Sequence, residues 1–230
     1  LENPKYSIVK EGFDRWRRYL DSFGFGERLG SDCLDEGTGQ VPDRAYYDKR
    51  YHGSWNALTV LSLSIGQGEV GCTPLQLANL ACIIANRGYY YIPHIVRKIE
   101  GCDSLDRRFY ERHYTMVDAR HFEPIVEGMW RSVHVDGTSK AAYLPDLDVC
   151  GKTGTAQNPN GRDHSTFLSF APKDNPRIAI SVYVEHGGFG ASTALPIASL
   201  LEEYYLTDTI RRPAMLEYVK NMQLPNYAQH

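Results

Sequence analysis

The sequence predicts an α/β fold of the α+β type, in which helices cover an antiparallel sheet. Three short segments of strand character, joined by tight turns, follow one another between residues 149 and 185. Segments with apolar residues at helical spacing stand on both sides of them. The 230 residues, 42% hydrophobic and 23% charged, have ordinary globular composition and can bury a sizeable core.

The first predicted helix covers residues 11–23, where aromatic and leucine side chains recur at helical spacing. Gly24 follows it as a stop signal. From Gly24 to Gly53 the chain is rich in Gly, Asp and Pro and has no sustained periodicity. We interpret this stretch as a long, ordered, irregular segment.

The next helix has a clear start signal. Thr73 is the N-cap, Pro74 takes the first helical position, and Gln76 completes a capping box. The body LQLANLACIIANR is apolar on nearly all sides, which predicts a deeply buried helix. Gly88 ends the helix where a left-handed residue is favoured. The following run, YYYIPHIVRKIE, is expected to be extended.

A further amphipathic helix is predicted over residues 119–135, closed by an Asp-Gly turn. The strands KTGTAQ, STFLSFA and RIAISVYVE follow, separated by turns at 158–161 and 172–176. Isoleucine and valine alternate with other residues in the third strand, so one face of the meander packs on a core. A helix from about residue 193 to 205 can cover the sheet, and PAMLEYVKNM predicts a short helix near the end.

These elements divide the chain into three regions. Residues 1–148 form a helical and irregular part, residues 149–206 hold the strands with their covering helix, and residues 207–230 form a tail. No run of about 18 apolar residues is present to span a bilayer. The chain starts without methionine in a charged, helix-like segment, and we expect it to be a piece of a longer protein.

Composition argues against several kinds of partner. The net charge of −3 without a Lys/Arg cluster predicts no nucleic-acid or anionic membrane partner. The eight histidines have no metal-ligand spacing, so neither a metal site nor a cofactor is expected, and His164 is interpreted as structural. The odd, widely spaced cysteines are interpreted mainly as small core residues; they are Cys33, Cys72, Cys82, Cys102 and Cys150.

The stretch VCGKTGTAQ, residues 149–157, is the most suggestive of chemistry. It mimics the end of a phosphate loop, but Asp146 stands where that loop needs glycine, and a turn and strand follow instead of a helix. One interpretation is a lysine on a solvated sheet edge with no special role. The other depends on Gly154, because a glycine inside a strand often marks the close approach of a ligand or another backbone.

The second interpretation is an edge strand that recognises an anion. Thr153 and Thr155 point to one side of a strand and Lys152 to the other. Hydroxyls and an ammonium group can bind a carboxylate, and the edge backbone can pair with an extended peptide. Charge-assisted bonds contribute roughly 1.5–3 kcal/mol each, enough to select ligands that end in a carboxylate.

Lys152-Thr-Gly resembles the third signature motif of penicillin-binding proteins and serine β-lactamases. The chain is further similar to class B transpeptidases of the penicillin-binding protein 2 type, from about residue 13 to about residue 206. The stretches that carry this similarity are DSFGFG with the following Leu-Gly, SIGQGEVGCTPLQLANLACIIANRG, GMWRSVHVDGTSKAA, and GKTGTAQ followed by DHSTFLSFAP. The resemblance implies a transpeptidase or serine β-lactamase-like fold, here incomplete.

The resemblance implies roles for four residues. Lys152, Thr153 and Thr155, with Gly154 between them, would bind the terminal carboxylate of a D-Ala-D-Ala stem peptide or of a β-lactam. The Thr155 backbone N–H would form half of an oxyanion hole. The implied reaction is acyl transfer through a serine ester, which cross-links peptidoglycan.

The family also needs an S-x-x-K nucleophile motif and an S-x-N motif. Ser7 to Lys10 matches the first and Ser54 to Asn56 matches the second. Ser7 leads into charged residues, however, and Asn56 precedes Gly66 by only ten positions (66 − 56), inside a segment with another place in the family. We interpret both as chance matches. The nucleophile is then expected upstream of this chain, and the fragment alone is expected to be inactive.

The resemblance places the parent protein on the periplasmic side of the bacterial inner membrane. An upstream transmembrane helix would anchor it, and a glycosyltransferase would be its partner. Two alternatives stay open. A D,D-carboxypeptidase or serine β-lactamase-like hydrolase would be distinguished by its deacylation rate. A non-enzymatic penicillin- or cell-wall-binding module would form a stable non-covalent complex with a D-Ala-D-Ala peptide.

Overall fold

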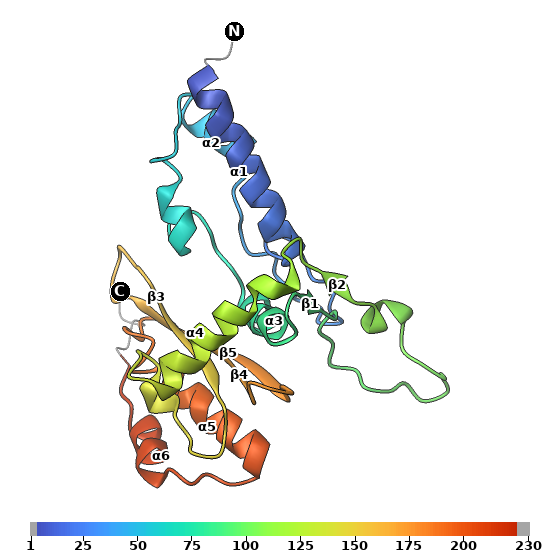
Figure 1. Ribbon diagram of the computed structural model, residues 1–230, viewed down its shortest axis with the longest axis vertical. Helices are drawn as coiled ribbons and strands as arrows, with labels where there is room; N and C mark the ends of the chain where they lie inside the picture. Colours follow the sequence, from blue (N-terminus) through green and yellow to red (C-terminus); the bar gives the residue numbers. More distant parts are fainter. Residues whose placement is uncertain (1–3, 225–230) are drawn as a thin grey trace. The chain divides into compact units, whose positions relative to one another are not determined.

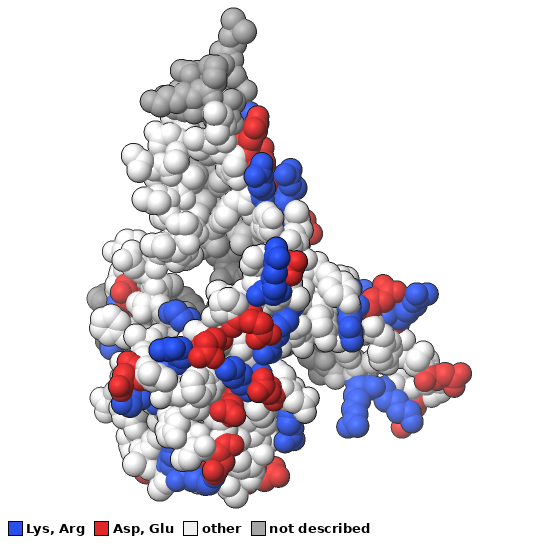
Figure 2. All heavy atoms as spheres, in the orientation of Figure 1, with Lys and Arg blue, Asp and Glu red and all other residues white. Residues whose placement is uncertain are grey.

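The computed structural model describes residues 4–224, with side chains from residue 8 onward (Figure 1). The chain separates into two compact units, one of residues 1–76 and 89–118 and the other of residues 77–88 and 119–230. Within residues 4–224, no helix combines the length and apolar character needed to cross a bilayer. Acidic and basic side chains are interspersed on the face in view in Figure 2, which agrees with the small net charge.

The first unit begins with α1, Pro4–Ser22, which starts earlier than the predicted 11–23. Its Phe13 packs edge-on against Tyr47 and Trp55, with ring centroids 5.4 and 5.3 Å away. Tyr47 lies on α2, Arg44–Arg50, inside the stretch for which the sequence predicted only irregular structure. That prediction was wrong here, because a helix of seven residues is too short to show a periodic pattern, and its stability comes from this aromatic cluster.

The rest of the irregular segment is held by Gln76. The Thr73 N–H donates to Gln76 Oε1 at 3.0 Å and the Gln76 N–H donates to Thr73 Oγ1 at 3.1 Å, which confirms the predicted capping box. The side-chain nitrogen of Gln76 donates to the carbonyls of Gly24, Glu27 and Thr38 at 2.9–3.0 Å. One buried amide therefore satisfies three carbonyls of a segment that forms no sheet or helix bonds there.

Glu36 has the corresponding role for backbone donors. Its buried carboxylate accepts the N–H groups of Leu29, Gly30 and Ser31. Such charge-assisted bonds are stronger than neutral ones, so they compensate for burying the carboxylate. The predicted order of the irregular segment thus depends on two buried polar side chains.

The helix after Thr73 is α3, Pro74–Ala85, and Gly88 follows it with a left-handed φ of 113°, as predicted. The next run is a strand only at β1, Tyr89–Tyr90, which pairs antiparallel with β2, His113–Tyr114. Ladder pairing in the run expected to be extended stops at Tyr90, and Pro93 has no N–H with which to continue a ladder.

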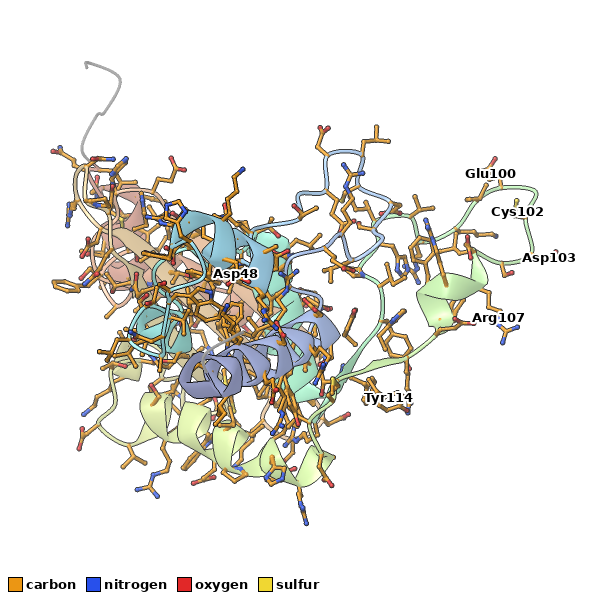
Figure 3. The ribbon with its side chains drawn as sticks, turned by 90° about the horizontal axis from the view of Figure 1, so that it is seen from above. Asp48, Glu100, Cys102, Asp103, Arg107 and Tyr114 are labelled. Carbon is orange, nitrogen blue, oxygen red and sulfur yellow. The ribbon has the colours of Figure 1, made fainter. Side chains whose placement is uncertain are left out.

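The loop between β1 and β2 contains the short 3-10 helix η2, Arg107–Tyr110. In Figure 3, Glu100, Cys102 and Asp103 lie at the far end of this loop, away from Tyr114 on β2. A second 3-10 helix of this unit, η1, covers Leu61–Ile65.

The second unit is built on an antiparallel sheet in the order β3-β4-β5. These strands are Cys150–Ala156, His164–Ala171 and Ile178–Val184, and they confirm the predicted meander. The alternating isoleucines and valines of β5 pack against a buried cluster that contains Phe167 and Leu195, as predicted. This sheet presents β3 as an edge strand.

Helices cover the sheet. α4, Glu123–His134, packs on β3, and α5, Ala194–Thr207, packs on β4 and β5. α4 begins after a separate 3-10 turn, η3 (Ala119–His121), rather than running from 119 as predicted. Pro124 explains this start, since proline lacks the N–H that a preceding helical turn would use. The 3-10 helix η4, Lys140–Ala142, and the helix α6, Pro213–Lys220, complete the unit.

Candidate functional site

The candidate site lies on the edge strand β3. Its outer side is not paired with any strand among the described residues. Lys152 is exposed on this strand, and its Nζ donates a hydrogen bond to the carbonyl of Thr153. The carbonyl is a neutral acceptor, so this contact leaves the positive charge of the ammonium group in place. An exposed cation on the edge strand of a sheet suits an extended, anionic ligand.

Thr153 brings a residue to the site that the sequence had not singled out. Its hydroxyl donates to Oγ1 of Thr138 at 3.1 Å. Thr138 stands in the turn between α4 and η4, where Ser139 is fully buried and donates its N–H to the Ser132 carbonyl at 3.1 Å. Thr138 lies in a stretch that carries the family resemblance. Its hydroxyl meets that of Thr153, 15 residues further along the chain, only once the turn has folded, so the sequence alone did not indicate the contact.

Gly154 is at a close approach between backbones. A Cβ there would lie 2.5 Å from Cγ2 of Thr166 on β4. A Cβ on Gly190, in the loop after β5, would lie 2.6 Å from the Gly154 carbonyl oxygen. A larger residue at Gly190 would push the loop from the strand, whereas a larger residue at Gly154 would clash with the Thr166 side chain on β4. A glycine inside a strand can mark the close approach of a ligand or of another backbone. The structure shows the second, because the backbone of Gly190 lies close to that of Gly154.

The loop 185–193, which carries Gly190, is fixed to the sheet. The Ser165 hydroxyl donates to the Phe189 carbonyl and accepts the Ala194 N–H, both at 3.1 Å. The Gly188 N–H donates to the Asp163 carbonyl at 2.8 Å. The Phe189 side chain remains 72% exposed beside these contacts. The loop is thus a firm neighbour of Gly154.

His164 accepts the backbone N–H of His186 on Nδ1 at 3.0 Å, and the two rings lie 5.0 Å apart. This bond orients the imidazole within the hairpin and agrees with the structural role expected for His164. In the part of the chain that the structure describes, no three His, Cys, Asp or Glu side chains gather in a way that could hold a metal ion.

Two buried titratable groups lie at the sheet: Cys150 is the first residue of β3, and Glu202 is on α5, which packs on β4 and β5. Burial raises the pKa of the Cys150 thiol to about 12, so this cysteine stays protonated and is a poor nucleophile. Burial also raises the pKa of Glu202 on α5 to about 8. Neither group is mainly charged at neutral pH, and Lys152 is the charged residue of β3 itself.

The two tempting matches to the other family motifs lie in the first unit. The Lys10 Nζ forms an ion pair with Asp48 at 2.9 Å, and Trp55 Nε1 donates to the same carboxylate oxygen at 2.7 Å. The Lys10 hydrogen bond lowers the pKa of Asp48. Asn56 Oδ1 accepts the Leu58 N–H at 2.9 Å in a local turn. Lys10 is thus paired with Asp48, and Asn56 is bonded to the backbone of its own turn. The Ser7 side chain lies outside the part of the chain whose side chains are described.

Comparison with known proteins identifies a family whose model this chain matches. Residues 9–201 match the model of the penicillin binding protein transpeptidase domain. The chain is 31% identical to the peptidoglycan D,D-transpeptidase MrdA of Haemophilus influenzae over 90% of this chain and 34% of that protein. A second MrdA, from Acinetobacter baumannii, is 30% identical over 88% of this chain and 32% of that protein. The chain thus spans about a third of the length of these curated relatives.

Solved structures agree with this match. PBP2 of Pseudomonas aeruginosa, solved in complex with WCK 5153, superposes with a TM-score of 0.74 at 33% identity, over 88% of this chain and 44% of that one. PBP2 of Helicobacter pylori, solved as a complex with MreC, has a TM-score of 0.67 at 29% identity, over 89% of this chain and 38% of that one.

Proposed function

This chain belongs to the penicillin-binding protein transpeptidase domain family, and we propose that it carries the carboxylate-binding strand of a peptidoglycan D,D-transpeptidase. The observation that supports the proposal most is the exposed edge strand β3, where the Lys152 ammonium donates to the Thr153 carbonyl and the Thr153 hydroxyl pairs with that of Thr138. Thr155, two residues along on the same side as Thr153, completes the proposed set.

The proposed chemistry uses each of these groups. The Lys152 ammonium and the threonine hydroxyls bind the C-terminal carboxylate of a stem peptide ending in D-Ala-D-Ala, or the carboxylate of a β-lactam. The outer edge of β3, which pairs with no strand among the described residues, aligns the rest of the ligand as an added strand, with Gly154 as part of that surface. The Thr155 N–H then donates to the oxyanion that forms when a serine attacks the carbonyl. The acyl group passes from the serine to an amine of a second stem peptide, which cross-links the two.

The test is the affinity of this chain for a tripeptide ending in D-Ala-D-Ala, measured against the same peptide with a C-terminal amide. Tight binding of the acid alone supports the carboxylate-binding strand, a feature that the non-enzymatic binding module would share. Lys152→Ala should weaken acid binding about tenfold or more, as expected for a charge-assisted bond. Lys98→Ala, which removes the same charge from an exposed site in the first unit, is the control. Equal affinities for acid and amide, or equal effects of the two variants, would refute the proposal.

We also propose that the nucleophilic serine is not in this chain and that the chain alone does not react with penicillin. The structural partners of Lys10 and Asn56 support this, because a lysine paired with Asp48 is not free to activate a serine. Incubation with excess benzylpenicillin, followed by intact mass measurement, is expected to give no covalent adduct. An adduct on Ser7 would overturn this part and would leave the carboxylate-binding strand standing.

The whole protein is proposed to work in the periplasm, held to the inner membrane by an upstream helix and acting with a glycosyltransferase. The names of the relatives as D,D-transpeptidases support transpeptidation over hydrolysis. Rapid release of a bound acyl group by water, measured in the longer protein, would favour a hydrolase instead.

A further inference from the structure

We propose that the segment after α5, residues 208–222, is a brace that positions the Lys-Thr-Gly-Thr strand from two sides. Arg212 and Tyr218 are its positioning residues. The proposal rests on the proposed function of that strand and concerns residues beyond 201, where the match to the family model ends. Neither residue is part of the carboxylate-binding set, so each acts through the backbone that it holds.

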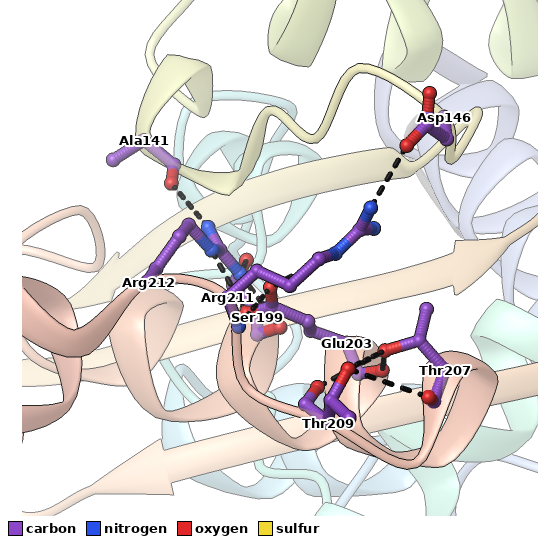
Figure 4. A network of polar contacts seen from close by, with 8 residues as sticks. All are labelled: Ala141, Asp146, Ser199, Glu203, Thr207, Thr209, Arg211 and Arg212. Atoms are coloured by element: carbon purple, nitrogen blue, oxygen red, sulfur yellow. Dashed lines mark hydrogen bonds and ion pairs between the residues drawn. The ribbon is translucent and has the colours of Figure 1, made fainter.

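The first side of the brace is held by the buried carboxylate of Glu203. Glu203 on α5 is fully buried, and its Oε2 accepts a hydrogen bond from Arg212 Nε at 3.0 Å (Figure 4). The Arg211 N–H donates to the other carboxylate oxygen at 2.9 Å. A buried carboxylate is tolerated only when it is paired and hydrogen-bonded, so these contacts fix the position of the chain after α5.

Arg212 uses its remaining donors to connect two elements. Nη2 donates to the carbonyl and hydroxyl of Ser199 on α5, at 3.0 and 2.8 Å. Nη1 donates to the carbonyl of Ala141 at 3.1 Å. Ala141 belongs to η4, three residues after Thr138 (141 − 138). The guanidinium therefore holds the turn that presents Thr138 to the Thr153 hydroxyl.

Arg211 reinforces the same turn. Its Nη1 forms an ion pair with Asp146 at 2.8 Å, in the segment between η4 and β3. This pair is partly exposed and contributes little by itself. It nevertheless adds a second attachment between the post-α5 segment and the chain that enters β3.

The other side of the brace is Tyr218 on α6. Its hydroxyl donates to the carbonyl of Ser192 at 2.8 Å. Ser192 lies two residues after Gly190, whose backbone packs against Gly154. Tyr218 is half exposed, so its ring buries little, and the hydroxyl is the part that reaches the loop. We infer that this hydrogen bond holds Gly190 on Gly154 and so fixes the backbone that leads to the Thr155 N–H.

The test compares Tyr218→Phe with the control Tyr204→Phe in the full 230-residue chain. Both variants remove one hydroxyl from a half-exposed tyrosine, and Tyr204 lies on α5 outside the brace. Amide hydrogen exchange is measured without ligand at Gly190, Gly154 and Thr155, with Ile180 on β5 as the internal reference. A brace predicts about fivefold faster exchange at Gly190 in Tyr218→Phe, the effect of one neutral hydrogen bond. It further predicts about twofold or faster exchange at Gly154 and Thr155, with Ile180 unchanged.

Arg212→Lys tests the first side, because lysine keeps the charge and loses the guanidinium fork. It should speed exchange at the Ser139 and Lys140 amides and weaken binding of the D-Ala-D-Ala acid about threefold. Arg107→Lys is the control, since Arg107 is 91% exposed on a surface ion pair in the first unit. If Arg212→Lys does not fold, Tyr218→Phe still decides the matter.

The outcomes separate the two proposals. Faster exchange at Gly190 alone, with Gly154 and Thr155 unchanged, would overturn the brace, because the loop would then move without the strand. The same exchange in Tyr218→Phe and Tyr204→Phe would overturn it as well. If wild type does not distinguish the acid from the amide, the proposed function fails while the exchange results still establish or refute the brace.

Discussion

Glu202 is a carboxyl group that the fold buries completely beside the sheet. Neither of its oxygens has a hydrogen-bond partner among the described residues. Burial raises its pKa to about 8, and the nearby Ser169 hydroxyl and Arg212 guanidinium offset only part of this effect. The Ser169 hydroxyl lies near enough to favour the charged form of Glu202, although it forms no hydrogen bond of ordinary geometry with that carboxyl group. Glu202 therefore remains mostly protonated at neutral pH, on the helix that packs on β4 and β5.

The raised pKa predicts a fall in stability as pH rises. Between the ordinary pKa of about 4.5 and the folded value of about 8, the folded chain holds a proton that the unfolded chain has released. Folding stability contributed by this group is therefore full below about pH 4.5 and is lost progressively up to about pH 8. Glu202→Gln removes the titration, so its stability should exceed that of wild type at pH 8 by at least about 1 kcal/mol.

Urea unfolding at pH 5 and pH 8 measures this difference. Glu100→Gln, on the exposed loop of the first unit, is the control and should follow wild type at both values. A Glu202→Gln variant with the same pH dependence as wild type would show that Glu202 is already ionised in the folded chain.

Gly154 carries a steric prediction. Gly154→Ala places a Cβ 2.5 Å from Thr166 Cγ2, so it should destabilise the chain by about 1–3 kcal/mol. Thr166→Ala removes that methyl group and should rescue most of the loss. Gly128→Ala is the control, since a Cβ there meets nothing within 4 Å in helix α4, and it should be neutral or stabilising. Independent, additive effects of the first two changes would contradict the clash.

At the scale of elements, Gln76 is one of the two buried polar side chains on which the irregular segment of the first unit depends. Gln76 satisfies three carbonyls and one N–H of residues that have no regular structure. Gln76→Ala should cost several kcal/mol, because it leaves one buried and two partly buried carbonyls without their donor. Gln40→Ala, an exposed glutamine of the same segment, should change stability by less than about 0.5 kcal/mol. Equal unfolding midpoints of the two variants would count against this role of Gln76.

Elements that are marked by a pattern of neighbouring residues were mostly predicted from the sequence. The capping box at Thr73, the left-handed Gly88 and the three strands with their turns are encoded within a few residues, and the structure contains them. Helix α2 is stabilised by its aromatic cluster and was not predicted; β1 lies in the run expected to be extended, but its partner β2 stands far along the chain, so the pairing was not predicted either. Thr138 was missed at the candidate site for the same reason, because its partner Thr153 is reached only through the folded turn.

At the scale of the whole molecule, the resemblance to penicillin-binding protein 2 that the motifs indicated is confirmed by the family match and by the related proteins. The expected mixed fold of helices and antiparallel sheet is confirmed as well. The roles of Lys152, Thr153, Gly154 and Thr155, and the division into three regions at 148 and 206, stay predictions. The central claim is that β3 recognises a peptide carboxylate.

The most direct test maps where the ligand binds. The amide signals of the ¹⁵N-labelled chain are followed while the D-Ala-D-Ala tripeptide, as free acid or as C-terminal amide, is added. The account predicts saturable shifts concentrated at residues 152–155 and Thr138 with the acid, and much smaller shifts with the amide. Shifts of equal size with both peptides, or shifts centred away from β3, would contradict it.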